Sequence, residues 1–334
     1  MTQEPPRLGV LDVGCFSAHL FVTDGSLLTP ALSHKIRLRL DRAIGPDGRI
    51  SRDGINRITD AVAQARTRAD RIGMPPMVAF ATSSIRDATN AAQVVAHVAR
   101  HTGVQLRVMS GEREAHLSYV AARNWFGHSA GMLVVLDVGG GTAELSVGDD
   151  NEPLHALSIP LGARTLARAG LDNAKSLPSM RAEVLERVEA ALADFPDVGN
   201  ARAVGCSKVF QQMARLAGAR PQRDGAFVPR RLRLDDLTKW IPRLGRLPAH
   251  QRAELPGISR HRAHQSLAGA VLAEALMKAI GHDVVDISPW STKEGLLLSL
   301  QQTTGFADGD DDGFLNGVPR RRGGRRLGKG IRSA

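Results

Sequence analysis

The pattern of hydrophobic and polar positions occurs twice in the chain. Residues 8–22 read LGVLDVGCFSAHLFV and residues 133–147 read LVVLDVGGGTAELSV, so nine of the 15 positions are identical. Each copy starts with a run rich in Val and Leu, passes through Asp-Val-Gly, and ends with hydrophobic residues at alternate positions. A buried run, a glycine turn and an alternating run predict a β-hairpin with the aspartate at the end of its first strand.

The segments after each copy alternate between strand and helix patterns. After the first copy we expect strands at 31–38, 77–81 and 104–109 and helices at 53–72, 91–100 and 112–125. After the second copy we expect strands at 155–160, 201–206 and 284–287 and helices at 164–169, 180–192, 209–216, 263–280 and 292–300. The stretch 266–280 carries Glu274 and Lys278 among apolar residues, so its helix is predicted to be amphipathic.

This order of elements predicts an α/β fold of two lobes with mixed sheets around an interdomain cleft. We expect an N-terminal domain at 1–130 and a C-terminal domain at 131–303. Whether the last helix packs back on the first domain stays open. Because ligands of such folds bind beyond the carboxyl ends of the strands and between domains, both hairpin turns are expected to face the cleft.

Composition and charge narrow the class of protein. The chain has 334 residues, 43% hydrophobic and 23% charged, which is typical of a soluble two-domain protein. The net charge of 44 − 34 = +10 favours an anionic substrate or partner. Residues 304–334 hold seven Lys or Arg and four Asp among few hydrophobic residues, so we expect a disordered basic tail there. The polar start, the two cysteines and the lack of a membrane-spanning stretch predict a cytoplasmic protein without a membrane partner.

The turns of the two hairpins have the composition of phosphate-binding loops. Glycines permit positive φ and leave backbone N–H groups uncovered, and such groups bind phosphate oxygens. Acids beside the turn can hold a divalent cation. An ordinary hairpin turn is the alternative for one copy alone, and the duplication favours phosphate binding. The second copy offers Gly139, Gly140, Gly141 and Thr142 with the acids Asp137 and Glu144, and the first offers Gly14, Cys15 and Ser17 with Asp12.

Two such loops resemble those of the actin-like (ribonuclease H-like) superfamily. Further segments are similar to the signatures of the exopolyphosphatase/guanosine pentaphosphate phosphatase (Ppx/GppA) family, in the family's order and spacing. They read ATSSIRDA at 81–88, SGEREA at 110–115, LDVGGGTAE at 136–144, IPLGA at 159–163 and KEGL at 293–296. The resemblance covers about residues 7–303 and implies a short, two-domain exopolyphosphatase of the actinobacterial type.

The resemblance also implies roles for individual residues. Glu114 corresponds to the general base that activates the attacking water, and Arg86 to an arginine that binds phosphate. From the residues alone, a solvated Glu114 and an ion pair of Arg86 with Asp87 stay open. Asp137 and Glu144 correspond to acids that hold Mg²⁺, or Mn²⁺ in its place. Further phosphate contacts are implied for Ser207, Lys208 and Arg262.

The implied reaction is removal of the terminal phosphate from linear inorganic polyphosphate by metal-assisted attack of water. Hydrolysis of guanosine pentaphosphate uses the same phosphate chemistry and stays open, as do other nucleotides as ligands. Cys15 and Phe16 stand where the family usually has Ser-Asn, which favours a third alternative, a polyphosphate- or nucleotide-binding regulator with low turnover. No signature of a nucleic-acid-binding fold is present, so nucleic acid is not an expected partner, and a homodimer stays open.

Deletion of residues 306–334 tests the role of the tail. The segment contains no signature residue, so the rate on a short polyphosphate at saturating concentration should be unchanged. At low salt the full chain should capture long polyanions faster, because unscreened basic segments steer association. The measurement is phosphate release with and without the tail. Loss of the rate on short substrate in a folded truncation would mean that the tail takes part in catalysis.

Overall fold

The duplicated pattern folds into two β-hairpins with the same register. The computed structural model describes residues 7–74 and 77–302, and in it β1 (Leu8–Val13) pairs antiparallel with β2 (Ser17–Thr23). In the same way β6 (Leu133–Val138) pairs with β7 (Ala143–Gly148). Each turn closes alike, since Gly14 N–H donates to the Ser17 carbonyl at 3.0 Å and Gly139 N–H to the Thr142 carbonyl at 2.9 Å. The predicted hairpins are confirmed.

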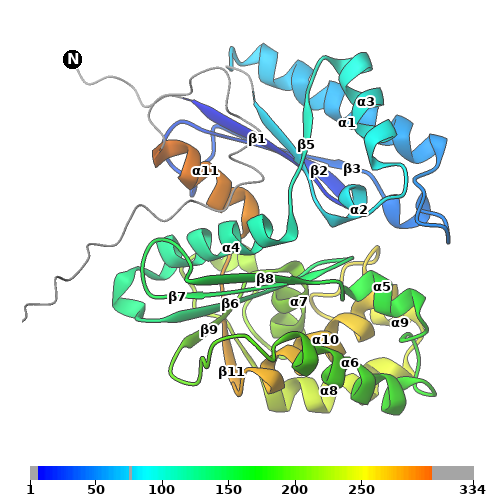
Figure 1. Ribbon diagram of the computed structural model, residues 1–334, viewed down its shortest axis with the longest axis vertical. Coiled ribbons are helices and arrows are strands. Elements are labelled where there is room, and N and C mark those ends of the chain that lie inside the picture. Colours follow the sequence, from blue (N-terminus) through cyan, green and yellow to red (C-terminus); the bar gives the residue numbers. More distant parts are fainter. Residues whose placement is uncertain (1–6, 75–76, 303–334) are drawn as a thin grey trace, which may run out of the picture.

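Each hairpin is the start of a mixed sheet (Figure 1). The first sheet has the order β3-β2-β1-β4-β5, with β3 (Leu32–Arg37) antiparallel to β2, and β4 (Val78–Ala81) and β5 (Leu106–Val108) continuing parallel to β1. The second sheet repeats this plan in the order β10-β11-β9-β6-β7-β8. Its further strands are β8 (His155–Ile159), β9 (Arg202–Gly205), β10 (Arg231–Arg233) and β11 (Val284–Ile287). The predicted fold class, α/β with two lobes that each contain a mixed sheet, is confirmed.

The edge strand β10 is an addition that the hydrophobic pattern did not predict. It has three residues, of which Leu232 alone is buried, and it pairs antiparallel with β11. One buried position between two exposed arginines is too short a pattern to indicate a strand.

Helices cover both faces of the first sheet. On one face lie α1 (Arg52–Arg71) and α3 (Ala91–Thr102), and a single turn, α2 (Ser83–Arg86), follows β4 (Figure 1). On the other face lie α4 (Gly111–Phe126) and α11 (Thr292–Gln302). The start of α4 is capped by Ser110, whose hydroxyl accepts from the Arg113 N–H at 3.2 Å. This cap fixes where the acidic first turn of α4 begins.

The second lobe contains six further helices among the described residues. One face of its sheet carries a large core that includes α10 (Ser266–Ala279). The prediction of an amphipathic helix here is wrong, because residues from Ser266 to Met277 are all buried. Its charge is neutralised by ion pairs: Glu274 pairs with Arg181, and with Lys278 at 3.4 Å. The others are α5 (Ala163–Arg168), α6 (Leu177–Ala191), α7 (Lys208–Leu216), α8 (Leu234–Arg246) and α9 (Ala249–Arg252).

The two lobes are joined through α4 and α11. In Figure 1, α4 lies between the two sheets, and it packs against β6, β7 and β8 as well as against α11. From α11, Leu296, Leu297 and Leu300 enter a core with Val10 and Phe80 of the first sheet. The last described helix therefore completes the first lobe. The predicted tail at 304–334 lies outside the described residues.

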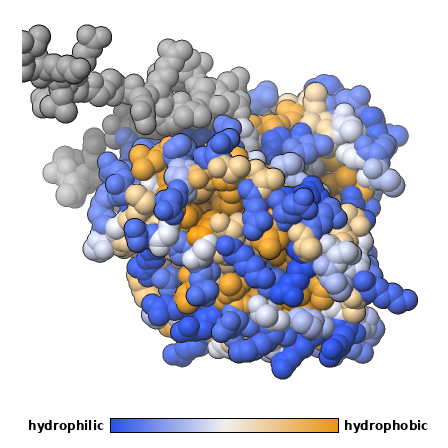
Figure 2. All heavy atoms as spheres, turned by 60° about the horizontal axis from the view of Figure 1, so that its bottom comes forward, coloured by the Kyte–Doolittle hydropathy of each residue, from blue (hydrophilic) through white to orange (hydrophobic). Residues whose placement is uncertain are grey.

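On the face of the surface shown in Figure 2, hydrophilic side chains alternate with areas of hydrophobic ones. Among the described residues, the exposed large hydrophobic side chains are those of Leu28, Leu154 and Phe227. No described helix has both the length and the apolar run needed to cross a lipid bilayer.

Candidate active site in the interdomain cleft

Both hairpin turns open onto one cleft of about 480 Å³ between the lobes. The sheet plan causes this meeting, because each turn lies at the carboxyl end of the first strand of its sheet. Two of the predicted site residues, Arg86 and Gly141, do not line the cleft directly. The predicted residues that line it are Asp12, Gly14, Cys15, Ser17, Glu114, Asp137, Gly139, Gly140, Thr142, Glu144, Ser207, Lys208 and Arg262.

In the second turn, close approach to the other lobe, and not backbone conformation, accounts for Gly141. Glycine permits positive φ, but neither Gly14 nor any glycine from 139 to 141 adopts it. A Cβ on Gly141 would lie 3.1 Å from the Ser83 hydroxyl, which belongs to the other lobe. In the described part of the chain, the N–H groups of residues 140–142 have no hydrogen-bond acceptor. The turn therefore has unpaired N–H donors beside the cleft, as a phosphate-binding loop must.

Asp137 and Glu144 form an acid pair because the strand register places them directly opposite each other on β6 and β7. Cross-strand neighbours have Cβ atoms roughly 5 Å apart, so their carboxyls share one side of the sheet. Ser118 and Ser291 donate to Asp137 Oδ2 at 3.3 and 3.2 Å, and Ser158 donates to Glu144 Oε1 at 3.1 Å. Burial, with Asp137 as the next cause, raises the pKa of Glu144 to about 8, and burial also raises the pKa of Asp137.

The first lobe repeats this pair with a histidine in place of the glutamate. Asp12 is opposite His19 on β1 and β2, and His19 is in turn opposite Lys35 on β3. Burial raises the pKa of Asp12 to about 6, although Lys293 opposes this, and burial lowers the pKa of His19 to about 4. This side of the cleft is thus less acidic than the Asp137 side.

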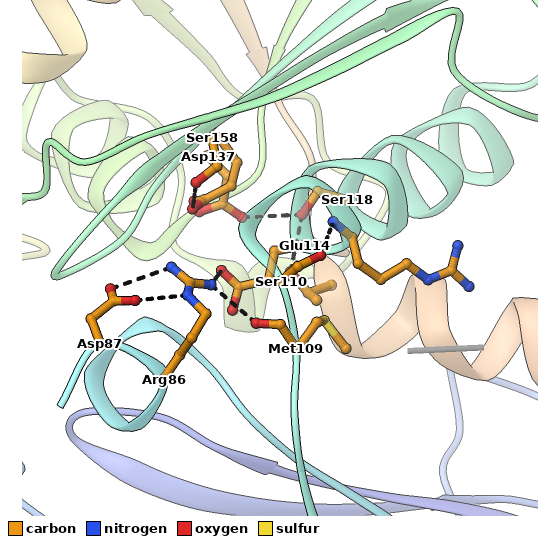
Figure 3. A network of polar contacts seen from close by, with 11 residues as sticks. Arg86, Asp87, Met109, Ser110, Glu114, Ser118, Asp137 and Ser158 are labelled. Carbon is orange, nitrogen blue, oxygen red and sulfur yellow. Dashed lines mark hydrogen bonds and ion pairs between the residues drawn. The ribbon is translucent and has the colours of Figure 1, made fainter. Parts of the chain in front are cut away.

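Glu114 enters the cleft from the first turn of α4 and is held from behind by Arg86 (Figure 3). Arg86 Nη1 lies 3.4 Å from Glu114 Oε2 and donates to the Met109 carbonyl, while its Nε donates to Asp87 at 2.8 Å. The second carboxyl oxygen, Glu114 Oε1, is buried without a hydrogen-bond partner among the described residues. Burial, followed by the nearby Glu144, raises the pKa of Glu114 well above its usual value.

Cations line the part of the cleft across from these acids. Burial, followed by repulsion from Arg262, lowers the pKa of Lys35, and burial, followed by repulsion from Lys35 and Arg262, lowers the pKa of Lys208. Lys293 also lines the cleft and forms an ion pair with the adjacent Glu294. Sequence reasoning missed Lys35 and Lys293 as site residues. The KEGL segment was a signal for Lys293, whereas Lys35 is recognisable only once β3 is known to pair with β2.

The unusual Cys15-Phe16 pair of the first turn contacts the second lobe. Arg164 Nη1, from the start of α5, donates to Cys15 Sγ at 2.8 Å and to Ser84 Oγ at 2.6 Å. The guanidinium of Arg262 lies over the Phe16 ring, 4.4 Å from its centroid. Cys15 and Phe16 therefore form contacts between the lobes. The residues of the turn also line the cleft.

The donors in the cleft suit a hard divalent cation bound together with substrate. Among the described residues, no three His, Cys, Asp or Glu side chains are grouped so as to hold a metal on their own. The Asp137–Glu144 pair offers carboxylate oxygens, and their raised pKa values show that negative charge is poorly compensated there. Mg²⁺ is commonly bound by one or two carboxylates with substrate phosphates and water completing its shell, so the pair fits such an ion.

Comparison with known proteins identifies the family. A model of the Ppx/GppA phosphatase family matches residues 21–304. The chain belongs to the Ppx/GppA phosphatase family. It is 40% identical over 304 residues to Exopolyphosphatase 1 of Mycobacterium tuberculosis, covering 87% of both chains. A guanosine-5'-triphosphate,3'-diphosphate pyrophosphatase of Aeromonas salmonicida is 23% identical over 302 residues, covering 88% of this chain and 59% of that protein.

A solved family structure supports the fold. The structure of an exopolyphosphatase from Cytophaga hutchinsonii superposes with a TM-score of 0.77 at 22% identity, covering 89% of this chain and 98% of that one. The family's two-lobed architecture is therefore shared over nearly the whole described chain.

Replacement of Glu144 by Gln should change how stability depends on pH. A carboxyl whose pKa rises from 4.5 to about 8 on folding binds more protons in the folded state, so its stabilising contribution is lost as pH rises through this window. In the metal-free protein, Glu144→Gln should remove a decline of up to about 1.4 kcal/mol per pH unit. Denaturant unfolding with a chelator from pH 5 to 8, with the exposed Glu186→Gln as control, measures this. Parallel pH curves for wild type and Glu144→Gln would contradict the burial argument.

Proposed function

We propose that the protein is an exopolyphosphatase that hydrolyses the terminal phosphate of linear inorganic polyphosphate by attack of water. The relatives named exopolyphosphatase at 40% identity over most of both chains support this substrate. The observation that carries the proposal is the pairing, in one cleft, of unsatisfied loop N–H donors with an unpartnered carboxyl oxygen of Glu114. The first group suits a phosphate and the second suits the proton of a water.

Glu114 is proposed as the general base. A phosphoanhydride is already activated, so the reaction needs an oriented water and a group that takes its proton. Glu114 Oε1 is free to accept that proton, while Arg86 holds Oε2. The raised pKa of Glu114 makes it a stronger base than an ordinary carboxylate. Direct binding of the terminal phosphate by Arg86 stays a prediction, because its guanidinium is occupied by Asp87, Glu114 and a carbonyl in this structure.

The phosphate groups are proposed to bind between the two turns and the cations of the cleft. The free N–H groups of residues 140–142 and the start of α7, with Ser207 and Lys208, supply donors on one side. Lys35, Lys293 and Arg262 supply positive charge from the other elements around the cleft. Fixed donors near the phosphoryl oxygens stabilise the negative charge that develops there in the transition state.

Asp137 and Glu144 are proposed to hold Mg²⁺ or Mn²⁺. A bound divalent cation would neutralise phosphate charge in the reaction. The serine hydroxyls on these carboxylates, from Ser118, Ser291 and Ser158, fix their orientation.

Guanosine pentaphosphate hydrolysis is the second candidate, since the pyrophosphatase relative is 23% identical over 88% of this chain. The higher identity to exopolyphosphatases favours polyphosphate. A low-turnover regulator is less favoured, because the Cys15-Phe16 pair that suggested it joins the lobes and leaves the acids of the cleft in place. Phosphate release from both substrates side by side separates the three alternatives.

Glu114→Gln should lower kcat on polyphosphate by roughly 10²- to 10⁴-fold, because the amide cannot take a proton from water. Binding of polyphosphate and thermal stability should be retained, since the volume of the side chain is unchanged. The control is Glu112→Gln, an exposed glutamate in the same helical turn. Turnover of Glu114→Gln at the wild-type rate would refute the assignment of the base.

Asp137→Asn should raise the Mg²⁺ concentration that gives half-maximal activity, because a neutral amide holds a hard cation less well than a carboxylate. Asp149→Asn, an exposed position at the far end of the same hairpin, should leave it unchanged. The measurement is a Mg²⁺ titration of phosphate release. Identical titrations for the two variants would exclude a metal beside this turn.

A further inference from the structure

A second cavity adjoins the catalytic cleft and has four arginines in its lining. Its volume is about 540 Å³, and it lies between the segment around Arg39 in the first lobe and α5, α9 and the loop before α10 in the second. His261 lines both this cavity and the cleft, Arg260 lines the cavity, and Arg262 lines the cleft. Three consecutive residues thus lead from one space to the other. We call this cavity the arginine pocket, defined by Arg39, Arg42, Arg168, Arg260, His261 and His264.

The charge of the arginine pocket is only partly compensated. Its walls contain four arginines and three histidines against two aspartates, Asp41 and Asp172. Arg39 lies 3.8 Å from Asp41, and Arg168 donates to two backbone carbonyls of the first lobe. Within residues 7–74 and 77–302, the exposed guanidinium groups of Arg42 and Arg260 have neither a hydrogen-bond nor an ion-pair partner. Two guanidinium groups, one from each lobe, are therefore available to a ligand.

The backbone at Arg39 is strained. Its φ is 58°, and no other non-glycine residue in the described part of the chain has a positive φ. Its Nε is buried without an acceptor. Strained residues are kept where the surrounding structure needs their position, and they concentrate at ligand sites. Arg39 is thus held with an unused donor in a wall of the pocket.

Arginines also lie close to the histidines of the pocket. Burial, followed by Arg262 and Arg37, lowers the pKa of His261. Burial lowers the pKa of His264, where Asp41 opposes the shift and Arg39 adds to it. A dense row of negative charges entering the pocket would relieve this repulsion.

The walls also indicate which anion fits. The apolar side chains of the pocket are Ala167, Ala249 and Ala253, and none of its residues is Phe, Tyr or Trp. A nucleoside would find no aromatic ring on which to stack its base. Guanidinium forks suit phosphate oxygens, and successive phosphates carry charge at short intervals. The chemistry therefore favours a chain of phosphates.

We propose that the arginine pocket binds phosphate groups of the polyphosphate chain that lie beyond the reacting end, so that long chains are held at two places. The inference rests on the proposed function, because it assumes that the terminal phosphate occupies the neighbouring cleft. A short polyphosphate would fill the cleft alone, whereas a long one would continue past His261 into the pocket. The pocket thus sets a preference for chain length.

The test is the double variant Arg42→Ser and Arg260→Ser, compared on long-chain polyphosphate and on tripolyphosphate at physiological salt. KM for the long chain should rise about tenfold or more, because two charge-assisted contacts are lost. KM for tripolyphosphate, and kcat for both, should stay within about twofold. The control is Arg71→Ser with Arg223→Ser, exposed arginines outside the pocket that remove the same charge, again one from each lobe.

Each other outcome overturns the proposal. An equal rise in KM for both substrates would assign the arginines to the catalytic cleft, and an equal rise in the control variant would indicate general attraction of a polyanion. No change in KM would show that the pocket does not bind the chain. Titration of long-chain polyphosphate into the same variants in a Glu114→Gln background measures binding without turnover. If wild type hydrolyses neither substrate, the proposed function fails, and a tenfold weaker binding in the double variant still supports the pocket.

Discussion

The crowding of carboxyl groups in a buried cleft is the constraint on which the site depends. Asp137 and Glu144 face each other because the hairpin register leaves them no other arrangement, and Glu114 reaches the same space from the capped first turn of α4. Burial opposes the charge of each one, so together they form a region where negative charge is costly. Cations on the other elements around the cleft offset part of this cost. Serine hydroxyls that donate to the acids offset another part. In the proposed reaction, a substrate that brings a cation and phosphate oxygens would balance the charge that the protein alone leaves uncompensated.

The two lobes share one sequence pattern but contribute different charges to the cleft. The same sheet plan and the same turn closure occur twice, yet the partner of the strand-end acid is Glu144 in one lobe and His19 in the other. Because burial lowers the pKa of His19, that histidine adds no positive charge at neutral pH. The second lobe thus carries the concentrated negative charge, while lysines dominate beside the first. This division of charge agrees with the proposal that a metal ion binds on the side of the second lobe and phosphate beside the lysines.

Much of the fold could be predicted from the sequence because hydrophobic periodicity is a local property. The hairpins, most strands and the acids of the turns follow from it directly. Tertiary context decided the rest. The buried surroundings of α10, the pairing of β3 that brings Lys35 into the cleft, and the contact of Arg86 with Glu114 all depend on segments distant in sequence. The glycine turn had the expected composition for a different reason, since the Ser83 side chain of the other lobe lies only 3.1 Å from where a Cβ on Gly141 would be.

The position of α11 has a consequence for folding during translation. Val10 and Phe80 lie in β1 and β4, but the leucines that cover them, Leu296, Leu297 and Leu300, come more than 200 residues later. Translation proceeds at roughly 5–20 residues per second, so one face of the first sheet stays exposed for many seconds. During that time this apolar face is prone to aggregation, and of the two helices that cover it only α4 is present. The first lobe can complete this core only after α11 has left the ribosomal exit tunnel.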